Sequence, residues 1–131
     1  MVTASSLTFS ILQEVFAVCR LEPEEPIPVW SLQRLFSITR TENELSIVCP
    51  QVNVPLEAQA SNFEGNWRCL KVEGPLDFAL TGILAAIAAP LAEAGISIFA
   101  ISTYDTDYVL VKQQDLDRAI QTLLQAGHQM V

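Results

Sequence analysis

Short apolar segments, some alternating with polar residues and one, residues 14–21, apolar on both faces for most of its length, follow one another in the first half of the chain. Such segments are typical of β-strands. The pattern predicts four short strands, at residues 7–12, 14–21, 36–41 and 45–50. The last two flank the polar tripeptide Glu42-Asn43-Glu44 and therefore predict a β-hairpin. A loop rich in proline and glutamate, and short helical segments at residues 29–35 and 55–60, complete this half.

The second half turns to a helical period after a further strand at residues 67–73. Ile83, Ile87 and Leu91 form one apolar stripe of a helix that starts near Thr81 and ends at Gly95. The remaining positions of this helix are largely alanine, so that another element can approach it closely. Pro90 removes one helical hydrogen bond and is expected to bend the last turn.

A second hairpin follows, with an apolar strand at residues 96–103, a turn at Tyr104-Asp105-Thr106 and a return strand at residues 107–112. Asp115 is expected to cap a final helix that Gly127 ends. The helix has one apolar face, made of Leu116, Ile120, Leu123 and Leu124.

The order of elements predicts an α+β protein with two units in tandem, at residues 1–65 and 66–131. The polar stretch at residues 61–66 is the predicted boundary. The second half reads β-α-β-β-α and needs one more strand to complete a sheet. Either the N-terminal strand or a very short strand in the tail, residues 128–131, is expected to supply it.

The charge balance argues against nucleic acid and against an anionic membrane surface as partners. The 131 residues include 15 acidic and 7 basic side chains, for a net charge of −8, without a Lys/Arg cluster. The longest apolar run, residues 83–92, is about half the length of a membrane span. The N-terminus lacks the basic and apolar segments of a secretory signal, so a cytoplasmic protein is expected.

Neither a catalytic centre nor a cofactor site is predicted. Cys19, Cys49 and Cys69 are widely spaced and are expected to be reduced thiols. The single histidine, His128, is expected to be solvated or to lie at a strand end. The segment Asp105-Thr106-Asp107 has too few oxygen ligands for a metal ion. An enzyme acting through Asp107 and Tyr104 is disfavoured because no second positioned titratable group accompanies them.

Three stretches resemble a known family: F-S-I-T-R-T-E-N-E-L-S-I-V from Phe36, G-I-L-A-A-I-A-A-P-L-A-E-A-G-I-S-I from Gly82, and I-S-T-Y-D-T-D-Y-V-L-V from Ile101. They are similar to tandem ACT-domain proteins, the family of the animal cytosolic arginine sensors and of small bacterial proteins with two ACT units. The resemblance implies two ferredoxin-like βαββαβ units, with antiparallel sheets and helices on one face. It is specific around S-T-Y-D-T-D and weak at residues 51–66.

The resemblance also implies where a ligand binds, because the ligand of these sensors lies where two ACT units meet. One unit offers the start of its second strand, which corresponds here to Ser97 and Ile98. The neighbouring unit offers its helix start and its hairpin, which correspond to Leu80, Thr81, Gly82, Ile83, Thr103, Tyr104 and Asp107. Since this chain has two units where the animal sensors have four, a homodimer with two equivalent sites is expected.

These residue types suit a free amino acid. The N–H groups at a helix start attract an α-carboxylate, and Gly82 leaves the backbone accessible. The carboxylate of Asp107 attracts an α-ammonium group or a basic side chain; its alternative role is that of a turn-capping or solvated aspartate. Ser97 is either a ligand contact or an outward strand residue. Tyr104 is either a lid or a surface aromatic, and Thr81 is expected to be the N-cap.

The sequence therefore predicts a non-catalytic regulatory module that binds a free amino acid, basic or otherwise, and that acts on a protein partner. The alternative is an interaction and dimerisation module that binds no ligand. Stabilisation of the folded protein by an amino acid separates the two predictions.

Overall fold

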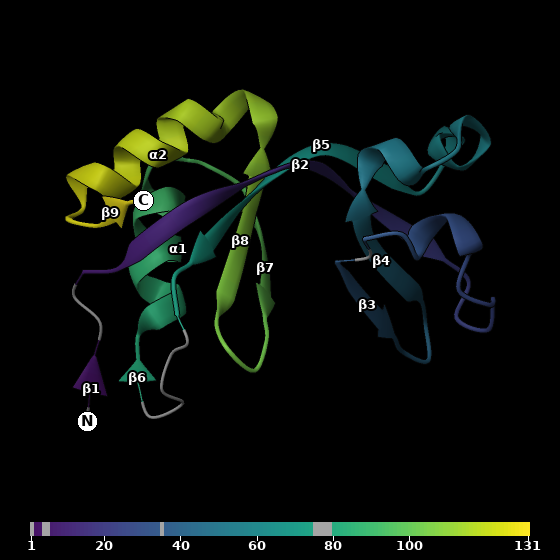
Figure 1. Cartoon of the computed structure of the whole chain (residues 1–131), viewed down its shortest axis with the longest axis horizontal. Coiled ribbons are helices and arrows are strands. Elements are labelled where there is room, and N and C mark those ends of the chain that lie inside the picture. Colours follow the sequence, from purple (N-terminus) through teal and green to yellow (C-terminus); the bar gives the residue numbers. More distant parts are fainter. Residues whose placement is uncertain (1, 4–5, 35, 75–79) are drawn as a thin grey trace. The chain divides into compact units, whose positions relative to one another are not determined.

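A computed structural model describes residues 2–3, 6–34, 36–74 and 80–131. The chain forms two compact units. We call residues 14–67 the strand unit, and residues 1–13 with 68–131 the helical unit. Strands β2 (Thr8–Leu21) and β5 (Phe63–Val72) run through both units. The predicted α+β class, with most of its helix in the second half, is confirmed (Figure 1).

The helical unit is a sheet with two helices. Its sheet has the order β2-β5-β8-β7, with β9 beside the start of β2, and β1 and β6 form a separate parallel pair. Its further elements are β1 (Val2–Thr3), β6 (Leu80–Thr81), α1 (Ile83–Glu93), β7 (Ile98–Ser102), β8 (Asp107–Lys112), η4 (Gln113–Asp115), α2 (Leu116–Gln125) and β9 (Gln129–Met130). The N-terminal strand and the short tail strand, predicted as alternatives, therefore both join this sheet.

Period-two alternation decides which sheet face the helices cover. Val109 and Val111 of β8 and Val72 of β5 are buried in one core cluster with Ile87 of α1 and Leu123 of α2. Alternate residues of a strand point to the same face, so these valines line the face on which both helices pack (Figure 1). The prediction of helices on one face is confirmed, and this core fixes the position of the start of α1.

The strand unit has strands in the order β3-β4-β2-β5 and short 3₁₀ turns in place of α-helices. Its further elements are η1 (Val29–Ser31), β3 (Ser37–Arg40), β4 (Leu45–Pro50), η2 (Gln51–Asn53) and η3 (Leu56–Ala60). The predicted hairpin is confirmed as β3–β4. The two predicted helical segments are short 3₁₀ helices, of three residues after Pro28 and of five residues after Pro55.

Two strand predictions in the first half were wrong. The strands predicted on either side of Gln13 are one strand of 14 residues, β2, in which Gln13 is an exposed position. The expected connector at residues 61–66 contains the start of β5. There Glu64 and Asn66 are exposed while Gly65 and Trp67 are buried, which is the alternation of a half-buried strand. The division of the two ACT repeats at residues 65 and 66 stays a prediction.

The helix ends differ from the predicted ones in detail. Asp115 precedes α2 as predicted, but its side chain makes no capping hydrogen bond; its Oδ1 pairs instead with Nη2 of Arg118 at 3.3 Å. Gly95 follows α1 and Gly127 follows α2, both with positive φ, as expected of helix-ending glycines. The turn predicted to lead into α1 falls largely on residues 75–79, outside the described residues.

Candidate functional site

The start of α1 is an open helix N-terminus. Gly82 is the N-cap, with a left-handed φ of 76°, and no side chain of the described residues caps the helix. The expected N-cap, Thr81, lies instead in β6, because the left-handed turn that begins the helix falls on the glycine. No described atom lies within 4 Å of where a Cβ on Gly82 would stand, and the first turn has no acidic residue. The N–H groups of this turn are therefore suited to a carboxylate.

The two residues before Gly82 belong to a small parallel pair. Val2 lies opposite Leu80 and Thr3 opposite Thr81, so that the N-terminal segment runs beside the entry to α1 (Figure 1). Ile83, the first helical residue, is buried in the helical unit's core. Among the predicted contact residues at this helix start, Gly82 has no described atom close to its Cα on the side-chain side. Ile83 fixes the turn by packing in the core.

The β7–β8 hairpin is tied to β5 by a residue that the sequence analysis treated only as part of a turn. Thr106 is buried, and its hydroxyl donates to the carbonyl of Val72 at 2.6 Å. Within the turn, the N–H of Thr103 donates to the carbonyl of Thr106 at 2.9 Å. A threonine between two aspartates gives no sequence signal of burial, apart from being in phase with Leu110 of the strand that follows, β8. The hydrogen bond from Thr106 to Val72 fixes the position of the next residue, Asp107.

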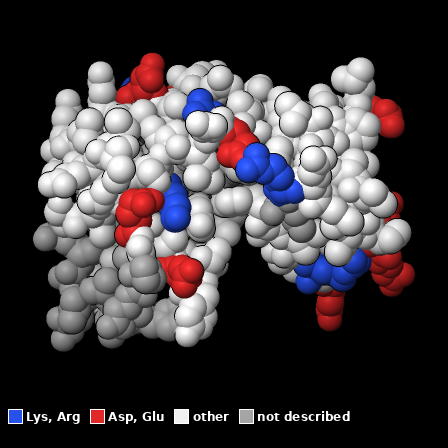
Figure 2. All heavy atoms as spheres, in the orientation of Figure 1, with Lys and Arg blue, Asp and Glu red and all other residues white. Residues whose placement is uncertain are grey.

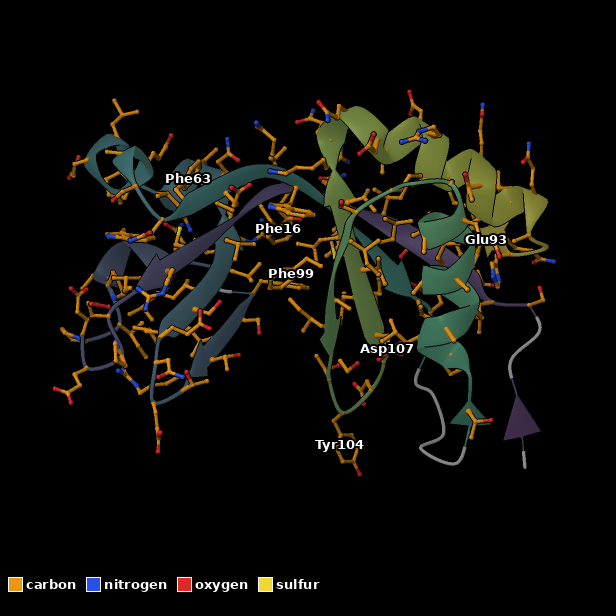
Figure 3. All side chains as sticks on the ribbon, turned by 180° about the vertical axis from the view of Figure 1, so that it is seen from behind. Phe16, Phe63, Glu93, Phe99, Tyr104 and Asp107 are labelled. Atoms are coloured by element: carbon orange, nitrogen blue, oxygen red, sulfur yellow. The ribbon has the colours of Figure 1, made fainter. Side chains whose placement is uncertain are left out.

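Asp107 is the first residue of β8 and lies opposite Ser102 of β7. It is half-buried and in phase with Val109 and Val111, so it lies on the face that the helices cover. Figure 3 shows Asp107 close to the first part of α1. No residue in the described ranges forms a hydrogen bond or ion pair with its carboxylate. A negative charge without a counter-charge thus lies at the same end of the helical unit as the open start of α1.

Tyr104 lies at the tip of the hairpin and is 81% exposed. Figure 3 shows its ring projecting away from the strands. Core packing therefore contributes little to its position, and its role as a lid stays a prediction.

Ser97 and Ile98 lie at the other end of the helical unit. Ser97 is exposed and precedes β7, while Ile98 opens that strand opposite Val111. The hairpin turn follows the far end of the same five-residue strand, about 15 Å away. One copy of the helical unit therefore brings Thr103, Asp107 and the start of α1 to one end, and leaves Ser97 and Ile98 at the opposite end.

His128 is buried between three elements and is not solvated; of the two predicted placements, the strand end is correct. Its Nδ1 accepts a hydrogen bond from the N–H of Leu7 at 3.0 Å, and its Nε2 lies 2.8 Å from the carbonyl of Ala86. An acceptor Nδ1 and a donor Nε2 describe a neutral ring with both nitrogens satisfied. A ring held in this way is not a general base.

The Ala86 carbonyl needs this donor because of Pro90. In a regular helix the carbonyl of residue 86 accepts from the N–H of residue 90, and proline has none. His128, far away in sequence, supplies the N–H that Pro90 lacks. The tail of the chain thereby stabilises α1, the helix whose start forms the candidate site.

The cysteines are unsuited to nucleophilic chemistry. All three are buried and free. Burial raises the pKa of the Cys19 thiol, and burial together with the nearby Cys19 raises the pKa of Cys49 to about 12. Both thiols are therefore protonated at neutral pH, which removes the reactive thiolate.

Neither a cluster of metal ligands nor, on the face shown, a continuous basic patch is present among the described residues. Within the described ranges, no three His, Cys, Asp or Glu side chains gather as metal ligands. On the face in Figure 2, Lys and Arg side chains are scattered among acidic ones and form no continuous patch. No α-helix in the described part of the chain has the length and apolar character needed to span a membrane.

Comparison with known proteins gives family matches along most of the chain. The family model of the ACT domain matches residues 62–125, and a model of an N-terminal domain matches residues 14–57. A solved structure of an Agrobacterium tumefaciens protein is 38% identical, with a TM-score of 0.89, and the alignment covers 98% of this chain and 94% of that one.

Curated relatives include the cytosolic arginine sensor for mTORC1 subunit 1. The Bos taurus protein is 34% identical over 106 residues, which are 74% of this chain and 32% of that protein. The human protein is 33% identical over 108 residues, again covering 32% of its length. This chain thus spans about a third of the length of these sensors.

More distant structures share the fold alone. The regulatory subunit of aspartate kinase from Thermus thermophilus is 12% identical with a TM-score of 0.64, covering 94% of this chain and 99% of that one.

Proposed function

Because this chain belongs to the ACT-domain family that includes the animal cytosolic arginine sensors and small bacterial two-ACT proteins, we propose that it is a non-catalytic regulatory module that binds a free amino acid where two ACT units meet. The observation that carries the proposal is the presence, at one end of the helical unit, of both the helix start at Gly82 and the carboxylate of Asp107, which has no partner among the described residues.

The two groups match the two charges of an amino acid. The N–H groups of the first turn of α1 and the positive end of its dipole bind the α-carboxylate. Asp107 binds the α-ammonium group or a basic side chain, through a charge-assisted hydrogen bond. Thr103 and Tyr104 border this space, and Leu80 and Thr81 supply the backbone that leads into the helix.

Ser97 and Ile98 complete the site from a second copy of the chain. They lie at the opposite end of the helical unit, so they reach the ligand of another copy and not that of their own. A two-fold homodimer then carries two equivalent sites. Ligand bound between copies stabilises one arrangement of the dimer over others, and this difference is what a protein partner in the cytoplasm detects.

The first experiment is thermal unfolding of the protein with each of the twenty amino acids at millimolar concentration. A ligand at about 100 times its Kd adds about 2.7 kcal/mol to the free energy of unfolding, which raises Tm by several degrees. We expect a shift with one amino acid or with a few related ones. A folded protein that none of the twenty stabilises would contradict the proposal and favour a ligand-free interaction module.

The site assignment is tested with Asp107→Ala. We expect this variant to lose the ligand-induced shift and to keep the Tm of the ligand-free protein, because the carboxylate has no partner among the described residues that folding would need. Asp105→Ala is the matched control, since it removes the same charge from an exposed position two residues away. Retained binding in Asp107→Ala, or equal loss in both variants, would refute the assignment.

A further inference from the structure

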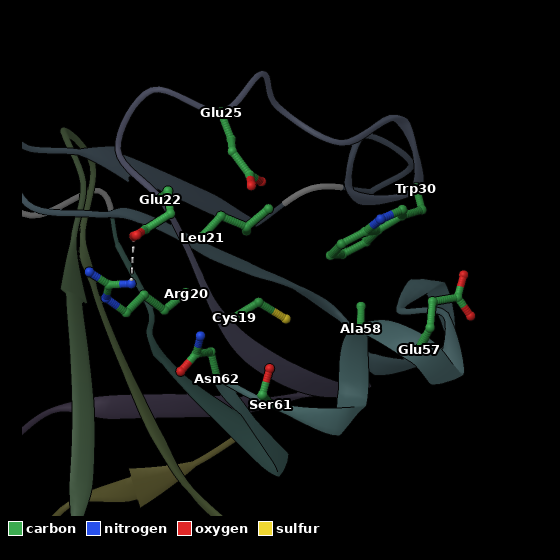
Figure 4. Close-up of a pocket in the computed structure, with 10 residues that line it drawn as sticks. All are labelled: Cys19, Arg20, Leu21, Glu22, Glu25, Trp30, Glu57, Ala58, Ser61 and Asn62. Atoms are coloured by element: carbon green, nitrogen blue, oxygen red, sulfur yellow. Dashed lines mark hydrogen bonds and ion pairs between the residues drawn. The ribbon is translucent and has the colours of Figure 1, made fainter.

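A second hollow lies wholly within the strand unit, apart from every residue of the proposed amino-acid site. It has a volume of about 360 Å³ and is lined by residues between Cys19 and Asn62 (Figure 4). Its base is Cys19 of β2, which is buried, with Leu21 and Ala58 beside it. The base is apolar because burial raises the pKa of the Cys19 thiol and so keeps it neutral.

One wall is the indole of Trp30. The ring packs on the core of the strand unit through one part of its surface and borders the hollow with another, as Figure 4 shows. The turn that carries it is fixed by Ser31, a buried residue whose hydroxyl donates to the carbonyl of Pro28 at 2.7 Å. The aromatic face is therefore a pre-positioned part of the wall.

The opposite wall is the turn into β5. Asn62 has a left-handed φ of 55°, and its carbonyl accepts from the N–H of Arg20 at 3.0 Å. This turn places the Ser61 hydroxyl and the Asn62 amide at the edge of the hollow, and Figure 4 shows the hydroxyl directed toward Cys19.

The lining has a net negative charge, because its one described basic residue, Arg20, is already paired with Glu22. Of the described lining residues, Arg20 is the one basic side chain, and it is already engaged by Glu22 at 3.1 Å and by the carbonyl of Asn43 at 2.8 Å. The carboxylates of Glu25 and Glu57 have no partner in the described part of the chain. Figure 4 shows the Glu25 carboxylate pointing into the hollow and that of Glu57 pointing outward.

The position of Glu25 is fixed by its backbone. Nη1 of Arg40 donates to its carbonyl at 3.0 Å, and its N–H donates to the carbonyl of Glu22 at 3.1 Å. The loop is thus held by main-chain contacts, which leaves the carboxylate available to a ligand.

We propose that this hollow binds a small organic cation, an alkylammonium or guanidinium compound without a carboxylate. The cation lies against the face of Trp30 and pairs with the carboxylate of Glu25, and its alkyl part covers the apolar base. A carboxylate is disfavoured because Glu25 and Glu57 repel it and Arg20 is occupied. The ligand class therefore differs from that of the amino-acid site, which requires a carboxylate.

The test is a titration of the ¹⁵N-labelled protein with agmatine, which has a guanidinium and an ammonium group and no carboxylate. We expect saturable shifts of the Trp30 indole N–H and of the Ser61 and Asn62 amides. Glu25→Gln should weaken binding about tenfold, because it removes one charge-assisted hydrogen bond. Glu24→Gln removes the same charge from the adjacent exposed residue, which does not line the hollow, and should leave the affinity within about twofold.

Asp107→Ala should leave the agmatine-induced shifts of Trp30, Ser61 and Asn62 unchanged, which separates this site from the proposed amino-acid site. The proposal is overturned if agmatine shifts no resonance of the hollow. It is also overturned if Glu24→Gln and Glu25→Gln weaken binding equally, since the attraction would then come from the general negative charge of the protein.

Discussion

At the scale of single residues, the pairing of His128 with Pro90 predicts a measurable coupling. His128→Ala leaves the N–H of Leu7 and the carbonyl of Ala86 without partners, at a cost of about 2–4 kcal/mol in the free energy of unfolding. Pro90→Ala restores the helical N–H that Ala86 needs. In the Pro90→Ala background we therefore expect His128→Ala to cost about 1 kcal/mol less than in the wild type.

Urea unfolding of the wild type, the two single variants and the double variant measures this coupling. If the double variant loses as much free energy of unfolding as the two single variants together, within error, His128 does not replace the donor that Pro90 lacks. The same comparison tests whether the tail of the chain stabilises α1.

His128 also shows what the sequence could not predict at this scale. A histidine three residues before the last one has no local signal of burial, and its two partners lie 42 and 121 residues away in the chain. The helix that begins after Gly82 and the strand that begins at Asp107 were predicted from local patterns. The role of both residues in a ligand site came from the resemblance to ACT proteins and stays a prediction. Residues held by long-range contacts, such as His128, have no such local signal.

At the scale of elements, the anchor of the β7–β8 hairpin gives the next prediction. Thr106→Val keeps the shape of the side chain and removes its hydrogen bond to Val72, leaving a buried carbonyl with one bond fewer. We expect a loss of about 1–2 kcal/mol in the free energy of unfolding, and weaker binding of any ligand that Asp107 contacts.

Thr39→Val is the matched control, because Thr39 is an exposed strand residue of β3. Chemical unfolding should place this control within about 0.5 kcal/mol of the wild type. A Thr106→Val variant as stable as the control would show that the hydrogen bond to Val72 contributes nothing to the hairpin.

The elements themselves could be predicted where a regular period covered a whole segment. The stripe of Ile83, Ile87 and Leu91 predicted α1, and alternation predicted β8 with the bounds that the structure has. One error arose at Gln13, a single polar residue within β2 that resembles the end of a strand. The other arose at residues 64–66, where the outward-facing polar residues of β5 resemble part of a connecting loop. Both are cases in which tertiary pairing extends a strand past its local signal.

At the scale of the whole molecule, the proposed amino-acid site takes residues from two chains, because its predicted contact residues lie at opposite ends of one helical unit. Ser97 lies at one end of the helical unit and Asp107 at the other. We therefore expect a dimer in solution, with a mass by light scattering of twice the 14.4 kDa of one chain.

Mixing two inactive variants tests this arrangement directly. Asp107→Ala removes one half of a site and Ser97→Arg, with its bulky side chain, blocks the other half, so neither variant alone should bind the amino acid. In a mixed dimer, the intact Ser97 of one copy meets the intact Asp107 of the other, and one functional site forms. After unfolding and refolding in equal amounts, about a quarter of the wild-type number of sites should return. A mixture that recovers no binding would place both residues in one copy's site, and would refute a site shared between chains.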